Sequence, residues 1–223
     1  MTILARDVAG LMPGGRAPRR EALADTRYSA LLGEAAWARL PQAVRRRFSK
    51  PVRPGAVTIY RGHVLSTELS RIGYLLAQAA RLVGGPLPLT PGGGGTVTVT
   101  VIEDPAFNGQ VWSRSYARGG RFPQVIHSAK RFLGATGLEE YLGWGLVMRL
   151  RLSVEEGALV FRSVAYGLEL CGRFLQLPSW ITPGACEVRH EDTGSGRFRF
   201  ELRLVHPLFG CLVRQLAVFE DPA

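Results

Sequence analysis

Residues 197–205 read RFRFELRLV, and this stretch decides the fold. From Phe198 to Leu204 every second residue is apolar, and the residues between them are charged. In a β-strand, alternate side chains point to opposite faces, so one face of this strand is apolar and the other is charged. The pattern therefore predicts a half-buried antiparallel sheet.

Strand patterns of this kind fill most of the chain and are joined by short turns, two of which read as hairpins at 155–157 and 193–196. The nine predicted strands are 57–64, 96–102, 110–118, 124–132, 146–154, 158–170, 186–191, 198–205 and 211–219. One amphipathic helix is predicted at 66–83, with Ser66 as its N-cap and Gly84 just after its end. Short helices are expected between 26 and 48.

A long run of half-buried strands must curl to cover its apolar side. We therefore predict an α+β fold in which a strongly curved antiparallel sheet of about nine strands forms a cup or open barrel. The main helix is expected across the concave face or one mouth, with the short N-terminal helices at the other end. Lipocalin-like and START-like cups have this architecture. Residues 1–24, rich in Gly, Pro and Arg, are predicted to be a flexible segment, and 25–223 a single curved-sheet domain.

The net charge of +10 is concentrated near the N-terminus, where residues 1–55 hold eleven Lys and Arg against four Asp and Glu. The triplet Arg45, Arg46 and Arg47 lies in this region. Such a triplet is usually a solvated helix C-terminus, and the alternative is a contact with an anionic membrane surface. No zinc-finger spacing, RNP motif or recognition helix is present, which argues against nucleic acid as a partner.

Three cysteines, Cys171, Cys186 and Cys211, form no close pair, which favours free, buried thiols in a reducing compartment. There is no long uncharged apolar stretch and no signal-peptide pattern, so we expect a cytoplasmic protein. The histidines are scattered and the aspartates dispersed, so no metal site is expected. The glycine run 92–95 lacks the Lys-Ser/Thr of a phosphate-binding loop, and we expect no cofactor.

Three motifs carry a resemblance to a known family: LQLPSWITPG at 175–184, RFRFEL at 197–202 and HPLFGCLVR at 206–214. They resemble the bacterial family catalogued as domain of unknown function 4166. Shorter similarities occur at 28–48, 112–114 and 140–143, so the resemblance extends over about 27–221. It departs at Gln215-Leu216, where the family usually has an aromatic residue followed by Arg-Gly. The resemblance implies no activity, but it does imply a dehydrogenase-like partner, since such modules are found beside or fused to the family.

Strand 110–118 carries the main candidate ligand site, because Trp112, Arg114 and Tyr116 share one face. An arginine between aromatic rings can bind a carboxylate or phosphate while the rings hold an apolar body. The alternative is a surface arginine stacked on exposed rings. On strand 158–170, Arg162 is a second candidate for the acidic head, and Tyr166 supplies contact area.

Glu140 and His127 are the candidate catalytic residues. Glu140 lies in an apolar segment, where it could be a desolvated base or the ion-pair partner of Arg114. His127 is the candidate acid–base partner on strand 124–132.

Three functions stay open at this stage. The first is a small-molecule binding protein whose β-cup holds an apolar or amphipathic ligand such as a lipid, polyketide or terpenoid-like body. The second is a metal-free, nucleotide-free cyclase or isomerase that acts on such a substrate. The third is a membrane-surface or interaction protein that uses the basic N-terminal region.

Overall fold

The computed structural model describes residues 25–51, 55, 57–84 and 86–222, so the prediction made for 1–24 lies outside the described residues. The strands are β1 (Val57–Leu69), β2 (Thr96–Asp104), β3 (Gly109–Arg118), β4 (Arg121–Arg131), β5 (Glu139–Gly143), β6 (Leu146–Glu155), β7 (Ala158–Leu170), β8 (Arg173–Gln176), β9 (Ala185–Gly194), β10 (Arg197–His206) and β11 (Gly210–Glu220). The helices are α1 (Arg27–Leu32), α2 (Glu34–Ala38), α3 (Gln42–Phe48) and α4 (Arg71–Ala80), with short 3-10 helices η1 (Arg81–Val83), η2 (Pro105–Phe107) and η3 (Ser179–Ile181).

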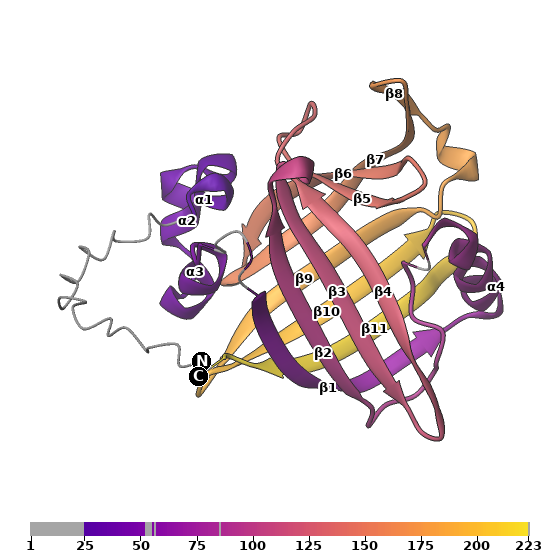
Figure 1. The fold of residues 1–223 in the computed structure, drawn as a ribbon, viewed down its shortest axis with the longest axis horizontal. Coiled ribbons are helices and arrows are strands. Elements are labelled where there is room, and N and C mark those ends of the chain that lie inside the picture. Colours follow the sequence, from indigo (N-terminus) through magenta and orange to yellow (C-terminus); the bar gives the residue numbers. More distant parts are fainter. Residues whose placement is uncertain (1–24, 52–54, 56, 85, 223) are drawn as a thin grey trace, which may run out of the picture.

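Ten of the strands close into an antiparallel barrel (Figure 1). Their order around the wall is β6-β5-β4-β3-β2-β1-β11-β10-β9-β7, and β7 pairs again with β6. Strand β8 pairs with β7 and stays outside the ring. Closure gives each of the ten strands two neighbours, which removes the exposed edges of an open sheet. The predicted cup or barrel is confirmed, although the barrel is closed and has more strands than the predicted nine.

Each predicted strand is present, and the two additional ones are β5 and β8. Strand β10, which contains the alternating residues 197–205, pairs with β9 on one side and β11 on the other. Phe198 and Leu204 are buried on its inner face, while Arg197 and Arg203 are exposed on its outer face. The alternation of residues 197–205 thus separates the barrel interior from solvent, as predicted.

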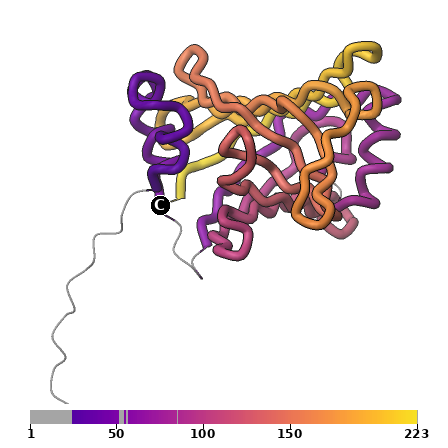
Figure 2. The backbone as a smooth tube through the Cα atoms, turned by 90° about the horizontal axis from the view of Figure 1, so that it is seen from above, coloured from indigo at the N-terminus to yellow at the C-terminus, as the bar shows by residue number. Residues whose placement is uncertain are grey.

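Helices α1, α2 and α3 cover one end of the barrel (Figure 2). Tyr28, Val44 and Phe48 are buried there in one core cluster with Leu138, which precedes β5, and Leu159 of β7. Arg47 of α3 joins this cover to the barrel through ion pairs of 2.7 Å with Asp192 and 2.6 Å with Asp221. The remaining members of the cluster are Leu40, Met148, Leu150, Phe161 and Tyr166. This end is therefore filled with side chains.

Helix α4 lies at the opposite end and is shorter than the predicted helix 66–83. Residues up to Leu69 continue β1 because they pair with β11, so Ser70 rather than Ser66 is the N-cap, and its side chain accepts a 3.0 Å bond from the Gly73 amide. Gly73 packs so closely on β11 that a Cβ would lie 1.9 Å from the Leu212 carbonyl oxygen. This contact fixes α4 across the mouth. In the part of the chain that the structure describes, no helix is long and apolar enough to cross a membrane.

Candidate ligand-binding cavity

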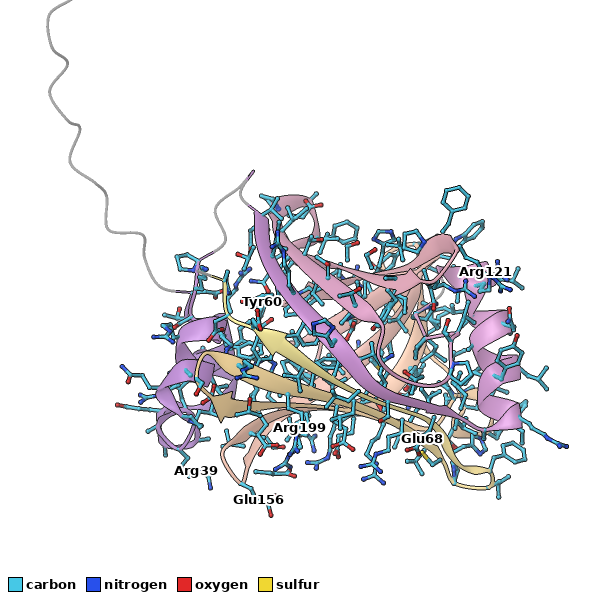
Figure 3. The ribbon with its side chains drawn as sticks, turned by 90° about the horizontal axis from the view of Figure 1, so that it is seen from below. Arg39, Tyr60, Glu68, Arg121, Glu156 and Arg199 are labelled. Atoms are coloured by element: carbon cyan, nitrogen blue, oxygen red, sulfur yellow. The ribbon has the colours of Figure 1, made fainter. Side chains whose placement is uncertain are left out.

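A cavity of about 370 Å³ occupies the barrel interior between α4 and the helices α1–α3 at the other end, which we call the helical plug. Small-molecule sites commonly measure about 300–1,000 Å³ and are mostly apolar with a few placed polar groups. Most lining residues here are hydrophobic, among them Tyr60 of β1, which lies in the barrel wall in Figure 3. Helix α4 and η1 contribute Leu76, Ala79, Ala80 and Val83 to the lining.

One wall of the cavity carries a compact charged cluster built by three neighbouring strands, β3, β4 and β5. Lys130 and Glu140 face each other across the β4–β5 pair, and the Lys130 Nζ donates to Glu140 Oε2 over 3.1 Å. The Ser128 hydroxyl donates to Glu140 Oε1 over 2.6 Å, and Arg114 Nη2 lies 3.3 Å from the same oxygen. A second bond of 3.2 Å runs from Arg114 Nη2 to Ser128 Oγ. One carboxylate therefore holds two cations and a hydroxyl.

In this cluster, burial and the neighbouring charges shift the pKa values of the ionisable side chains in opposite directions. Burial alone would raise the pKa of Glu140, but Lys130, Arg114 and the Ser128 hydroxyl stabilise the carboxylate and bring its pKa down to about 2. Burial lowers the pKa of Lys130, and the adjacent carboxylate opposes that shift. The ammonium also lies 5.0 Å from the centre of the Trp112 ring, a cation–π contact. Glu140 is thus a poor general base at neutral pH and a good counter-ion.

The cluster contains two cations and one anion, so it leaves one positive charge unbalanced inside an apolar cavity. Arg114 uses only Nη2 in the bonds above, and its Nε and Nη1 donate no hydrogen bond within the described residues. Trp112 precedes it on the same face, and the buried Trp112 Nε1 has no partner among the described residues. A buried donor without an acceptor is costly. An anionic oxygen that accepted hydrogen bonds from both Arg114 and the Trp112 N–H would give these donors the acceptor that they lack.

Two further polar pairs lie along the cavity on either side of the cluster. Toward α4, the Tyr116 hydroxyl donates to Gln215 Oε1 over 3.0 Å, and Gln215 Nε2 donates to Thr67 Oγ1 over 3.0 Å. Toward the helical plug, the Tyr28 hydroxyl lies 3.4 Å from Gln110 Oε1. These side chains bond to one another, whereas Arg114 and Trp112 keep donors without an acceptor. Two further lining residues, Arg47 and His190, also have a buried nitrogen, Nη1 and Nε2 respectively, with no partner among the described residues.

Most of the predicted ligand-binding residues come together in this cavity. Trp112, Arg114 and Tyr116 line one wall, as the alternation on strand 110–118 indicates. Tyr166 is also a lining residue, and burial raises its pKa. Glu140 lies in the same cavity as the partner of Arg114, which was one of its two predicted roles.

The prediction for Arg162 is not supported by its position. Its side chain pairs with Glu155 and Glu187 and is 42% exposed, so it lies on the outer face of the barrel. The β6–β7 register shifts by one residue at Val164, which pairs with no residue of β6. Such a bulge reverses the alternation. Tyr166 therefore faces inward although Arg162, four residues earlier, faces outward.

The candidate catalytic pair does not form. His127 is exposed on β4, between the buried residues Ile126 and Ser128, so it points away from the cavity that contains Glu140. The histidine that lines the cavity is instead His190, whose pKa burial lowers to about 3. It stacks on Phe198 with ring centres 4.4 Å apart. Within the described residues, no group of three or more His, Cys, Asp or Glu could hold a metal ion.

Within the basic triplet of α3, the expected solvated position does not hold for Arg47, whose side chain is only 4% exposed. Arg47 lies inside the ion-pair network with Asp192 and Asp221, and Arg46 is the exposed member. The expectation of three buried thiols is wrong for Cys171 and Cys211, which are exposed.

Sequence reasoning missed several polar residues of the cavity and its charged cluster, among them Ser128, Lys130 and Gln215. The alternation of β4 carries a signal for the first two, because they occupy the same face as Ile126. Lys130 is also one of only two lysines among twenty-eight basic residues. Gln215 stands where the family pattern has an aromatic residue, and its bond to Tyr116 explains how a polar residue is tolerated there.

Comparison with known proteins gives a family but no relative of known activity. Curated proteins contain no match to the chain, and solved structures contain none either. The model of the family described as a domain of unknown function (DUF4166) matches residues 40–219, which include all the barrel strands except Glu220, the last residue of β11. The predicted resemblance is confirmed, and the chain belongs to the DUF4166 family.

Proposed function

We propose that this protein binds an amphipathic small molecule with an acidic head group, such as a fatty acid or a similar lipid, polyketide or terpenoid acid. The observation that carries the proposal is the unbalanced positive charge of Arg114 and Lys130 over Glu140, in a cavity that is also lined by Trp112 with its unpartnered N–H. A carboxylate at this position would restore charge balance and give Trp112 an acceptor.

The apolar body of the ligand would extend from this position toward α4. Between the cluster and the mouth the cavity is lined by Leu76, Val83, Leu142, Leu146 and Leu204, whereas the other end is filled by the helical plug. Burying an apolar chain among these side chains supplies affinity, and the charged wall supplies orientation. The lid position of α4 suits a ligand that enters by that mouth.

The test is displacement of a fluorescent fatty acid by a long-chain acid and by the alcohol of the same chain length. A charge-assisted hydrogen bond to a buried group is worth about 1.5–3 kcal/mol, so the acid should bind about 10- to 100-fold more tightly than the alcohol. Arg114→Leu should abolish this preference, because the guanidinium that faces the head group is lost.

Arg162→Leu is the matched control, since it removes the same side chain from the outer face of the barrel. It should leave the preference for the acid unchanged. Equal affinity of the unmodified protein for acid and alcohol, or loss of the preference in both variants alike, would refute the proposal. Thermal unfolding of each variant confirms that the barrel is intact.

A further inference from the structure

The most exposed large apolar side chains stand at one end of the barrel. Five of them are more than three-quarters exposed: Leu82 (79%), Phe122 (92%), Trp144 (82%), Trp180 (78%) and Leu208 (82%). We call these five the apolar rim. They come from η1, the β3–β4 hairpin, the β5–β6 turn, η3 and the β10–β11 turn. Single exposed hydrophobic residues are common, but five from separate connections at one end are a pattern.

The antiparallel topology places these connections together. The hairpins β3–β4, β5–β6 and β10–β11 turn at the end where β1 leads into α4, and the Ser70 amide there donates to Leu212 at the start of β11. Figures 1 and 2 show these turns around α4. At the opposite end, with α1–α3, the most exposed large apolar residue is Val57 at 50%. The apolar rim therefore surrounds the mouth that α4 covers.

Arginines accompany the apolar rim. Arg71 and Arg81 flank α4, Arg118 and Arg121 close the β3–β4 hairpin, and Arg173 begins β8. Figure 3 shows Arg121 at the α4 end, with Arg39 and Glu156 at the other end. None of the five forms an ion pair within the described residues.

The nearby carboxylates do not neutralise these arginines. Glu169 pairs with Arg131, and Glu187 pairs with Arg162, so both are already occupied on the outer wall. Glu68 is exposed near the end of β1, where it faces Arg214 across the β1–β11 pair. The α4 end thus presents exposed aromatic and aliphatic tips together with an excess of arginine.

We propose that the apolar rim inserts into the surface of an anionic lipid bilayer. Tryptophan and other large apolar tips sit at the headgroup level of a membrane, and arginines beside them bind lipid phosphates. The cavity reaches α4 from the inside, so a docked barrel would open toward the lipid. That this mouth exchanges a ligand with the bilayer rests on the proposed function, whereas the docking itself rests on the rim.

The first experiment is flotation of the full chain with phosphatidylcholine vesicles, with and without phosphatidylglycerol. Binding should require phosphatidylglycerol and weaken as salt rises. Phe122→Ser combined with Leu208→Ser should reduce binding at least about tenfold, because two anchors no longer leave water. Val57→Ser with Ile59→Ser removes two exposed apolar residues away from α4 and should leave binding unchanged.

The arginines are tested separately. Arg121→Gln and Arg173→Gln should each weaken binding about fivefold, as expected for one basic residue at an anionic surface. Arg46→Gln on α3 is the matched control and should have no effect. If Arg46→Gln abolishes binding and the rim variants do not, the membrane contact lies at the helical end and the proposal is wrong.

Two residues of the apolar rim are tryptophans, so their fluorescence can show how deeply the rim inserts into the bilayer. Trp144 and Trp180 fluorescence should shift to the blue on vesicles and be quenched by brominated lipid, and the double replacement Trp144→Phe and Trp180→Phe should remove most of the quenching. Absence of vesicle binding, or capture of a protein partner by the rim in its place, overturns the proposal. Normal vesicle binding by a chain that does not bind an amphipathic acid would refute the proposed function alone.

Discussion

Replacing Glu140 by Gln should destabilise the barrel strongly, because it leaves Lys130 and Arg114 buried without their shared anion. The side chains of Glu140 and Lys130 are only 9% and 8% exposed. The pKa of Glu140 falls from its usual 4.5 to about 2 on folding. A shift of that size corresponds to about 3 kcal/mol, in the range of about 3–5 kcal/mol expected when one partner of a buried ion pair is removed.

The pH dependence gives an independent check on the same residue. A carboxyl whose pKa is lower in the folded state stabilises the protein above its unfolded value, and this stabilisation is lost as pH falls from about 4.5 toward 2. The unmodified protein should therefore lose about 3 kcal/mol more across this interval than Glu140→Gln does. Urea unfolding followed by circular dichroism at neutral and acidic pH measures both quantities.

The control is Glu191→Gln, which breaks the partly exposed pair with Arg199 on the outer wall and should cost less than about 1 kcal/mol. Adding Lys130→Met to Glu140→Gln should recover at least half of the loss, since it removes one of the two uncompensated cations. If Glu140→Gln costs less than the control and keeps the acid sensitivity of the unmodified protein, the buried cluster does not carry the charge balance described above.

Three further results are expected. Ser70→Ala should cost about 1 kcal/mol because the N-cap bond to Gly73 is lost, whereas Ser66→Ala, in β1, should cost less; chemical denaturation compares the two. Gly73→Ala should shift α4 away from Leu212, since the added Cβ meets a backbone oxygen at 1.9 Å, and stopped-flow measurement should show faster ligand release, while unchanged release would mean that α4 does not cover the mouth. A thiol reagent at mildly alkaline pH should modify the exposed Cys171 and Cys211 but reach Cys186 only after unfolding, because burial raises the Cys186 pKa to about 12; three rapid reactions would contradict the buried position.

The sequence predicts the barrel strands well because apolar and polar residues alternate along each strand, and a few neighbouring residues are enough to reveal this pattern. Strand β10 shows this, since each apolar residue from Phe198 to Leu204 is on the inner face. Closure is harder to predict, because the short strand β5 reads as a turn: Glu139 and Glu140 put a carboxylate on each face, and neither face looks apolar. The structure buries both, with Arg131 bonded to Glu139 and Lys130 bonded to Glu140.

The site residues show where the alternation of side chains between the two faces of a strand ceases to predict which residues face the cavity. This alternation places Trp112, Arg114 and Tyr116 correctly because β3 is regular over that span. The alternation fails between Arg162 and Tyr166, because a bulge at Val164 reverses the two faces and no residue type at this position indicates a bulge. The charged cluster itself needs the pairing of β4 with β5, a long-range contact that one strand's pattern does not contain.

The central claim is that an anionic head group binds to Arg114 and the Trp112 N–H inside the barrel, and the indole signals of the four tryptophans in a ¹H–¹⁵N correlation spectrum test it most directly. Titration with a fatty acid should move the Trp112 signal strongly downfield as its unpartnered donor gains an oxygen acceptor, and the alcohol of the same chain length should not. A fatty acid that saturates the protein while the Trp112 signal stays in place would contradict the claim.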